Sequence, residues 1–126
     1  MIDIERYSQD LSKLRSTIEK AADALNLPLL QEELAELREE MNVPEFWNDL
    51  ERSTSVNRKV SQIENKLNRV KRLNERADDI EAMLMLLKED PDEDMGAECE
   101  AELVSLAEDA DALRADCLSG NALFLP

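Results

Sequence analysis

Residues 56–87 read VNRKVSQIENKLNRVKRLNERADDIEAMLMLL, and the spacing of their apolar side chains decides the fold. These side chains follow one another at steps of three and four residues: Val56, Val60, Ile63, Leu67, Val70, Leu73, Ala77, Ile80, Leu84 and Leu87. Such steps place them along one face of a helix, as in a coiled coil. We therefore predict one continuous helix from about residue 51 to residue 89, about 55–60 Å long at 1.5 Å per residue.

Three shorter segments show the same spacing. Their apolar residues are Ile4, Tyr7, Leu11, Leu14, Ile18, Ala21 and Leu25 in the first, Leu30, Leu34, Leu37 and Met41 in the second, and Cys99, Leu103, Leu106, Ala110, Leu113 and Cys117 in the last. We expect Asp3 to cap the first helix, Pro28 to separate the first from the second, and Pro44 to end the second. We expect Asp90 to cap the last helix, with Pro91 in its first turn.

Short links between helices imply antiparallel neighbours. The sequence thus predicts an all-α fold: an elongated helical bundle or antiparallel coiled coil, with the 56–87 helix as its spine and the first and last helices packed along it. Aromatic residues make up only 3% of the chain and Gly occurs twice, which disfavours a sandwich or barrel of strands. We expect residues 1–120 to form one helical domain and residues 121–126 an atypical tail.

The composition argues against catalysis. The chain has no His, so the usual proton shuttle and the commonest metal ligand are missing, and no Gly-rich run is present to hold phosphates. Asp90, Asp92 and Asp94 alternate as in a calcium loop, but Met95 and Ala101 stand where that loop needs Gly and Glu. We expect no enzyme activity, cofactor, metal, membrane segment or small-molecule substrate. The two Cys are expected to be buried, reduced thiols of a cytoplasmic protein.

Charge is distributed unevenly along the chain. The net charge is −15, yet residues 51–76 hold 8 Lys and Arg against 3 Asp and Glu, a net of +5. The cations that we single out, all off the apolar seam, are Arg58, Lys59, Lys66, Arg69, Arg72 and Arg76. One hypothesis is that they are neutralised by acidic neighbouring helices. The other is that some of them contact nucleic acid phosphate without reading sequence.

Phe46 and Trp47 hold two of the four aromatic side chains and follow closely after Pro44. We predict that they plug the core where the second helix turns into the spine, and that Trp47 is buried there. The alternative is an exposed anchor for a partner, because aromatic residues are enriched at interface hot spots.

The string Pro44-Glu45-Phe46-Trp47-Asn48-Asp49-Leu50-Glu51-Arg52 resembles a motif in the N-terminal domain of bacterial peptide chain release factor two. The order of helices around it and the Leu118-Ser119-Gly120 ending fit the same family. Leu50 departs from the usual Pro, and residues 121–126 depart from the family's continuation. The family's Gly-Gly-Gln loop and Ser-Pro-Phe codon reader, which belong to later domains, do not occur in the 126 residues.

This resemblance implies a role in translation termination, in a domain that docks on the ribosome and does not itself catalyse release. It implies contact with the protein of the large-subunit stalk base, and the basic helix adds a candidate contact with adjacent rRNA phosphate. Pro44, Phe46 and Trp47 are then the structural motif. A different class of function, a free-standing coiled-coil scaffold or adaptor, shares the same composition and helix seams.

Overall fold

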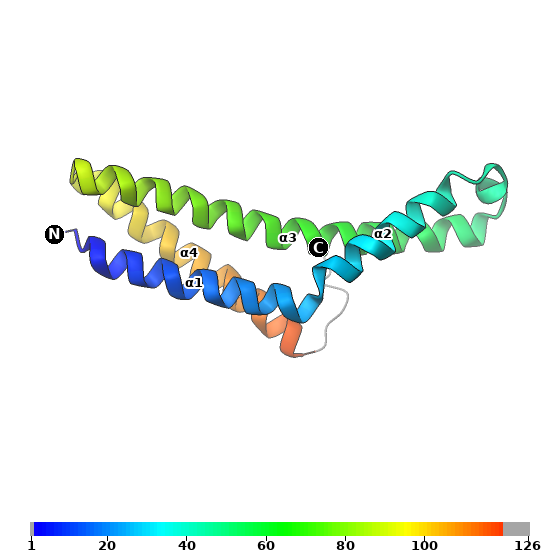
Figure 1. The fold of residues 1–126 in the computed structure, drawn as a ribbon, viewed down its shortest axis with the longest axis horizontal. Coiled ribbons are helices and arrows are strands. Elements are labelled where there is room, and N and C mark those ends of the chain that lie inside the picture. Colours follow the sequence, from blue (N-terminus) through cyan, green and yellow to red (C-terminus); the bar gives the residue numbers. More distant parts are fainter. Residues whose placement is uncertain (1, 120–126) are drawn as a thin grey trace.

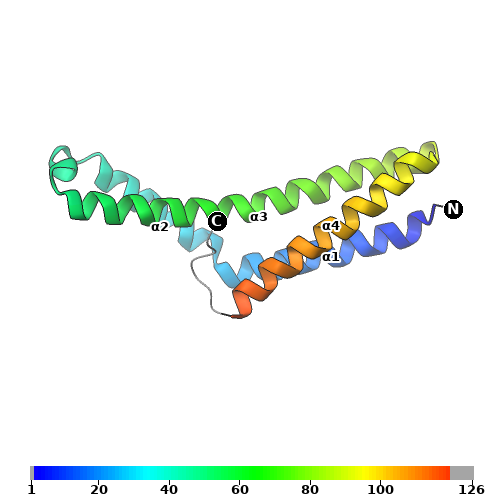
Figure 2. The ribbon, with the colours of Figure 1, turned by 180° about the vertical axis from the view of Figure 1, so that it is seen from behind.

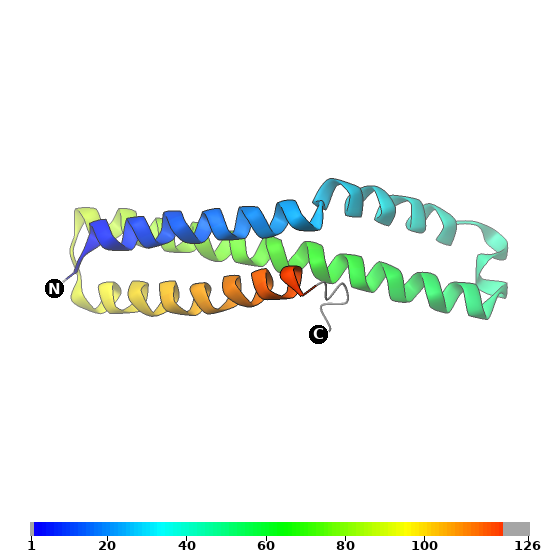
Figure 3. The same ribbon diagram turned by 90° about the horizontal axis from the view of Figure 1, so that it is seen from below.

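The computed structural model describes residues 2–119, which fold into four α-helices and one short 3₁₀ helix (Figure 1). They are α1 (Ile4–Leu25), α2 (Leu27–Met41), η1 (Pro44–Asn48), α3 (Leu50–Glu89) and α4 (Glu93–Leu118). Helix α3 has 40 residues and runs almost the whole length of the molecule (Figure 3). The predicted all-α, elongated fold with a long spine helix is confirmed. The predicted tail, residues 121–126, lies outside the described residues.

Two separate cores lie along α3. Its second half packs against α1 and α4 in a three-helix bundle, which we call the bundle (Figures 2 and 3). Its first half packs against α2 and η1 in a two-helix projection, which we call the arm. The arm core consists of Leu34, Leu37, Phe46, Val56, Val60 and Ile63. All the predicted seam residues of α3 are buried except Leu67, which is half-buried where one core gives way to the other.

The end of α3 carries a broad apolar run, of which only part is buried. The run from Met83 to Leu87 indicates contact with two neighbours, and α3 does pack on both α1 and α4. Leu84 and Leu87 are buried, but Met85 and Leu86 are exposed. Only residues that return to the seam at steps of three or four face the other helices.

The break between α1 and α2 lies at Asn26, in the left-handed region with φ 55° and ψ 68°. Its backbone N–H donates to the carbonyl of Asp23, and its side chain accepts from the N–H of Leu29 at 3.4 Å. Asn therefore ends one helix and caps the next, and it tolerates this conformation better than most residues. The predicted break is confirmed, but Leu27 is already helical, so the turn itself is made by Asn26 rather than by the residue before Pro28.

The link between α3 and α4 corrects one predicted cap. Asp92, not Asp90, precedes the first residue of α4, and its carboxylate accepts from the N–H groups of Asp94 at 2.9 Å and Met95 at 3.5 Å. Asp90 instead follows the last residue of α3, and its N–H donates to the carbonyl of Leu86. Pro91 therefore lies in the link and not, as predicted, in the first turn of α4, and the carboxylate that caps α4 is that of Asp92.

The start of α4 lies close to the N-terminal end of the chain. Gly96 is buried on α4, and a Cβ atom at this position would lie 2.7 Å from Cγ1 of Ile2. Gly96 therefore lets Ile2 pack against the bundle core. No helix within residues 2–119 is both long enough and apolar enough to cross a lipid bilayer.

Candidate functional site

The motif around Trp47 forms the free end of the arm, as η1 and its flanks (Figures 1 and 3). Phe46 is 6% exposed and packs in the arm core, as predicted. Trp47 is 56% exposed, so the prediction that it is buried was wrong. Its ring meets the Phe46 ring edge to face, with 4.9 Å between centroids. Consecutive residues of a short helix cannot both point into one small core, and Phe46 takes the inward position.

The residues after Trp47 start α3. Asp49 has an extended backbone, and its carboxylate accepts from the N–H of Arg52 at 3.0 Å. The hydroxyl of Ser53, which is buried, donates to the carbonyl of Leu50 at 3.1 Å. Pro44 lies at the first position of η1, where the missing N–H costs nothing. The motif is thus a turn that follows the end of α2 at Met41 and caps α3.

Arg52, the last residue of the motif, joins the two helices of the arm. Its guanidinium donates to both carboxylate oxygens of Glu40, with Nε–Oε1 at 2.6 Å and Nη2–Oε2 at 2.7 Å. These hydrogen bonds lower the pKa of Glu40 and raise the pKa of Arg52. A two-point contact of this kind fixes geometry as well as charge. The last turn of α2 is therefore fastened to the first turn of α3.

The six candidate cations of α3 do not form one continuous positive surface. Arg69 pairs with Asp116 of α4 at 2.8 Å, and Arg76 pairs with Asp109 of α4 at 2.6 Å. Arg76 also donates to the hydroxyl of Ser105 at 3.0 Å. These cations are therefore held by the acidic face of α4.

The other four candidates differ in their surroundings. Lys59 lies 3.4 Å from the carboxylate of Glu33 in α2. Lys66 is half-buried. Burial raises the pKa of the Cys117 thiol, and the positive charges of Arg69 and, to a smaller extent, Lys66 oppose this rise. Arg58 and Arg72 are exposed and form no ion pair with any residue from 2 to 119. The neutralisation hypothesis thus describes Lys59, Arg69 and Arg76, whereas Arg58 and Arg72 have cationic groups open to a partner.

Comparison with known proteins identifies the family. Residues 30–120 match the PCRF domain. The chain belongs to the PCRF domain family. Similar proteins include peptide chain release factor 2 of Clostridium perfringens strain SM101, which is 29% identical over 122 residues (96% of this chain and 33% of the relative). That of Kineococcus radiotolerans is 31% identical over 102 residues (81% and 28%), and that of Rhodococcus jostii 36% over 106 residues (84% and 28%).

The chain spans about a third of the length of these curated relatives. The predicted resemblance to the N-terminal domain of peptide chain release factor two is confirmed. The part that matches the PCRF domain begins within α2 and runs through η1, α3 and α4, so it contains the whole Trp47 motif. Helix α1 lies outside the matched part, yet it supplies one wall of the bundle core.

One polar cluster in the bundle was missed from the sequence. Glu100 of α4 accepts hydrogen bonds from Arg6 at 2.7 Å and from the hydroxyl of Tyr7 at 3.1 Å. Both bonds lower the pKa of Glu100, while burial, and then the bond to Glu100, raise the pKa of Tyr7. The cluster joins α1 to α4. The sequence did contain a signal for this cluster: Tyr7 is the only aromatic residue in the predicted seam of α1, and a buried tyrosine hydroxyl needs a hydrogen-bond partner.

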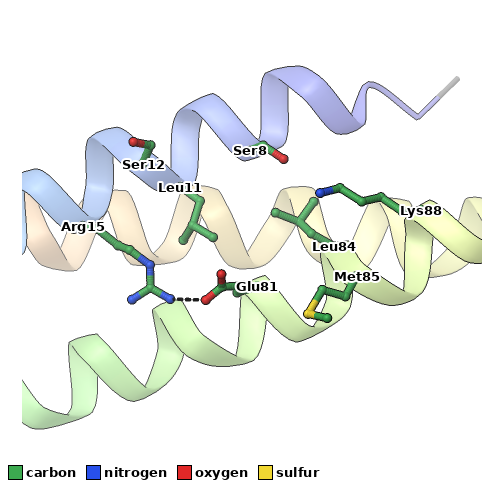
Figure 4. Close-up of a pocket in the computed structure, with 8 residues that line it drawn as sticks. All are labelled: Ser8, Leu11, Ser12, Arg15, Glu81, Leu84, Met85 and Lys88. Carbon is green, nitrogen blue, oxygen red and sulfur yellow. Dashed lines mark hydrogen bonds and ion pairs between the residues drawn. The ribbon is translucent and has the colours of Figure 1, made fainter.

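A groove lies between α1 and α3 on the surface of the bundle (Figure 4). Its lining residues are Ser8, Leu11, Ser12, Arg15, Glu81, Leu84, Met85 and Lys88. Arg15 bridges the helices by pairing with Glu81 at 2.8 Å and Asp78 at 2.9 Å. These contacts link charged side chains at the surface, beside the apolar core that holds α1 to α3.

The cysteines lie where the α4 seam places them. Cys99 is buried and Cys117 is half-buried, and neither forms a disulfide within residues 2–119. Burial raises the pKa of both thiols, which disfavours the reactive thiolate. Over the same residues, no three His, Cys, Asp or Glu side chains are grouped so that they could hold a metal ion.

Proposed function

We propose that this chain acts in translation termination as a docking domain of a peptide chain release factor, without catalytic activity of its own. The observation that carries the proposal is the similarity to peptide chain release factor 2, which covers 96% of the chain for the Clostridium perfringens protein. In this role the chain contacts the stalk base of the large ribosomal subunit in the cytoplasm. Catalysis of release belongs to later domains of such a factor.

The shape of the domain supports docking. Helix α3 has 40 residues, about 60 Å at 1.5 Å per residue, and it carries an arm beyond the bundle. Most helical stability in proteins comes from packing, and α3 is packed along both of its halves. A stiff projection of this kind suits contact with a large partner at a fixed distance. The scaffold alternative accounts for the helix seams but not for the similarity to release factors.

The candidate rRNA contact narrows to Arg58 and Arg72. They are two heptads apart on α3, so they lie on the same side of the helix, about 21 Å from each other. Both are exposed, and no carboxylate within residues 2–119 pairs with them. Arg69, Arg76 and Lys59 already have acidic partners, which reduces the positive charge that they present to phosphate. The stalk-base protein remains the main expected contact, since the chain's net charge of −15 opposes close approach to RNA.

The test compares two double variants in binding to purified large ribosomal subunits. We expect Arg58→Gln/Arg72→Gln to keep the thermal midpoint and to bind more weakly, with a salt slope smaller by about one unit for each phosphate no longer neutralised. Arg69→Gln/Arg76→Gln removes the same charge but breaks ion pairs with α4, so we expect a lower midpoint and a smaller decrease in affinity. Unchanged binding by the first variant would exclude the rRNA contact. Failure of the unaltered chain to bind the subunits would exclude docking altogether.

A further inference from the structure

The free end of the arm exposes three large apolar side chains within eight residues. Val43 is 48% exposed, Trp47 56% and Leu50 78%. We call these three residues the arm tip. They flank or belong to η1, at the opposite end of the molecule from the start of α1 and the start of α4 (Figures 1 and 3). Exposing an indole and a leucine together is costly in water, and grouped exposed apolar residues mark interaction sites.

The arm tip is held in one shape before any partner binds. Phe46 is anchored in the arm core and stacks edge to face against Trp47. The Arg52–Glu40 contact fastens the helices on either side, and Asp49 caps α3. A prearranged aromatic side chain loses little conformational entropy on binding, and this favours its use as an anchor.

The charge around the arm tip is negative. Residues 39–51 contain five carboxylates, those of Glu39, Glu40, Glu45, Asp49 and Glu51, and no Lys or Arg. The next cation along the chain, Arg52, pairs with Glu40 and so neutralises one of the five, which still leaves a net negative charge. Such a surface repels phosphate and attracts a basic protein. The partner that fits is therefore a protein surface rich in Lys or Arg with an apolar socket.

We propose that the arm tip docks on a basic protein surface, with the indole of Trp47 inserted into an apolar socket. This inference rests on the proposed function, in which that surface belongs to a protein of the large ribosomal subunit. It assigns the two kinds of contact to different places: protein to the arm tip, and rRNA phosphate to Arg58 and Arg72. The tip is small, so its contact is of the limited size typical of transient complexes, and Trp47 is its central residue.

The first experiment measures binding of variants to purified large ribosomal subunits. Trp47→Ser is expected to raise Kd at least about tenfold, as removal of an interface hot spot does. The control is Val104→Ser, because Val104 on α4 is also 56% exposed but lies in the bundle. Circular dichroism melts of both variants check that the helices are retained. Leu50→Ser, which removes a side chain with almost no packing in the chain itself, is expected to weaken binding without changing the melt.

The second experiment asks whether a positive charge placed at the arm tip weakens or strengthens binding to the large subunit. Glu45 is exposed, and Glu45→Lys is expected to weaken binding if the partner is a basic protein. The same variant would bind more tightly if the arm tip faced rRNA, which would overturn the proposal. Protein-free 23S rRNA serves as a second probe, and on it we expect Trp47→Ser to have no effect.

Trp47 is also a direct reporter, because it is the only Trp in the chain. Labelling with 5-hydroxytryptophan separates its emission from that of ribosomal proteins. We expect a blue shift when large subunits are added, since the indole leaves water. Binding of the unaltered chain without a shift, and with full affinity of Trp47→Ser, would overturn this inference and leave the docking proposal standing. Absence of any binding by the unaltered chain would overturn both.

Discussion

At the scale of single residues, the neighbouring pair Phe46 and Trp47 shows how one motif supplies both packing and an exposed surface. Phe46 closes the arm core, whereas Trp47 is more than half exposed and meets the Phe46 ring edge to face. Arg52 adds an ion pair with Glu40 that fixes the geometry of the turn. Because this pair is exposed to solvent, it contributes little to the free energy of unfolding. The motif is therefore a rigid end piece that presents one aromatic side chain to solvent.

The two aromatic residues should differ sharply in their effect on stability. We expect Phe46→Ala to lower the free energy of unfolding by about 3–5 kcal/mol, as large truncations in a core do. Trp47→Ala should lower it by only about 1 kcal/mol, mostly through removal of the aromatic contact. Urea unfolding followed by circular dichroism measures both values. Equal decreases would contradict the assigned burial of the two rings.

At the scale of elements, the boundaries of the helices follow from short polar side chains. Asn26 both ends α1 and caps α2, and Asp92 caps α4. Helix α3 has no such break in 40 residues, but its apolar residues take two steps of three in succession at Leu67, Val70 and Leu73. This shift in the heptad phase coincides with the change of partner from α2 to α1 and α4, because the seam must rotate to meet helices on another side.

The left-handed backbone of Asn26 makes a specific prediction. We expect Asn26→Ala to lower the free energy of unfolding by about 1–2 kcal/mol, because Ala is strained in this conformation and cannot cap α2. Asn26→Gly should cost much less, because Gly adopts this conformation without strain. Chemical unfolding of the two variants decides the matter. A larger decrease for Gly than for Ala would contradict the left-handed backbone of Asn26.

At the scale of the whole molecule, one helix serves two cores of unequal size. The bundle buries side chains from α1, α3 and α4, whereas the arm core contains only six buried residues among those described. Ion pairs from α3 add further links, to α2 through Lys59 and to α4 through Arg69 and Arg76. The arm is thus an extension with a smaller buried core than the bundle.

Amide hydrogen exchange should reveal this difference. We expect the amides of α2 and of residues 50–63 to exchange faster than those of α1, α4 and residues 70–87, because fewer buried neighbours protect them. Exchange followed by mass spectrometry resolves the two halves of α3. Uniform protection along α3 would show that the arm and bundle open as one unit.

Much of this protein was determined by the sequence itself. The apolar spacing predicted the seams of all four α-helices, the spine helix to within one residue, and the antiparallel packing of its neighbours. The Pro44–Arg52 string indicated the family, which the PCRF match confirms. These features could be predicted because helix periodicity is a property of local backbone geometry, which residue spacing records directly.

Tertiary structure decided which side chains remain available at the surface. The sequence does not say which of Phe46 and Trp47 points inward, because both are large, aromatic and adjacent. It also does not distinguish Arg69 and Arg76, which meet carboxylates of α4, from Arg58 and Arg72, which have no ion-pair partner within residues 2–119. The carboxylates that meet Arg69 and Arg76 lie more than thirty residues away along the chain. Burial and ion pairing depend on distances between elements, and only the packing of α2 and α4 against α3 sets those distances.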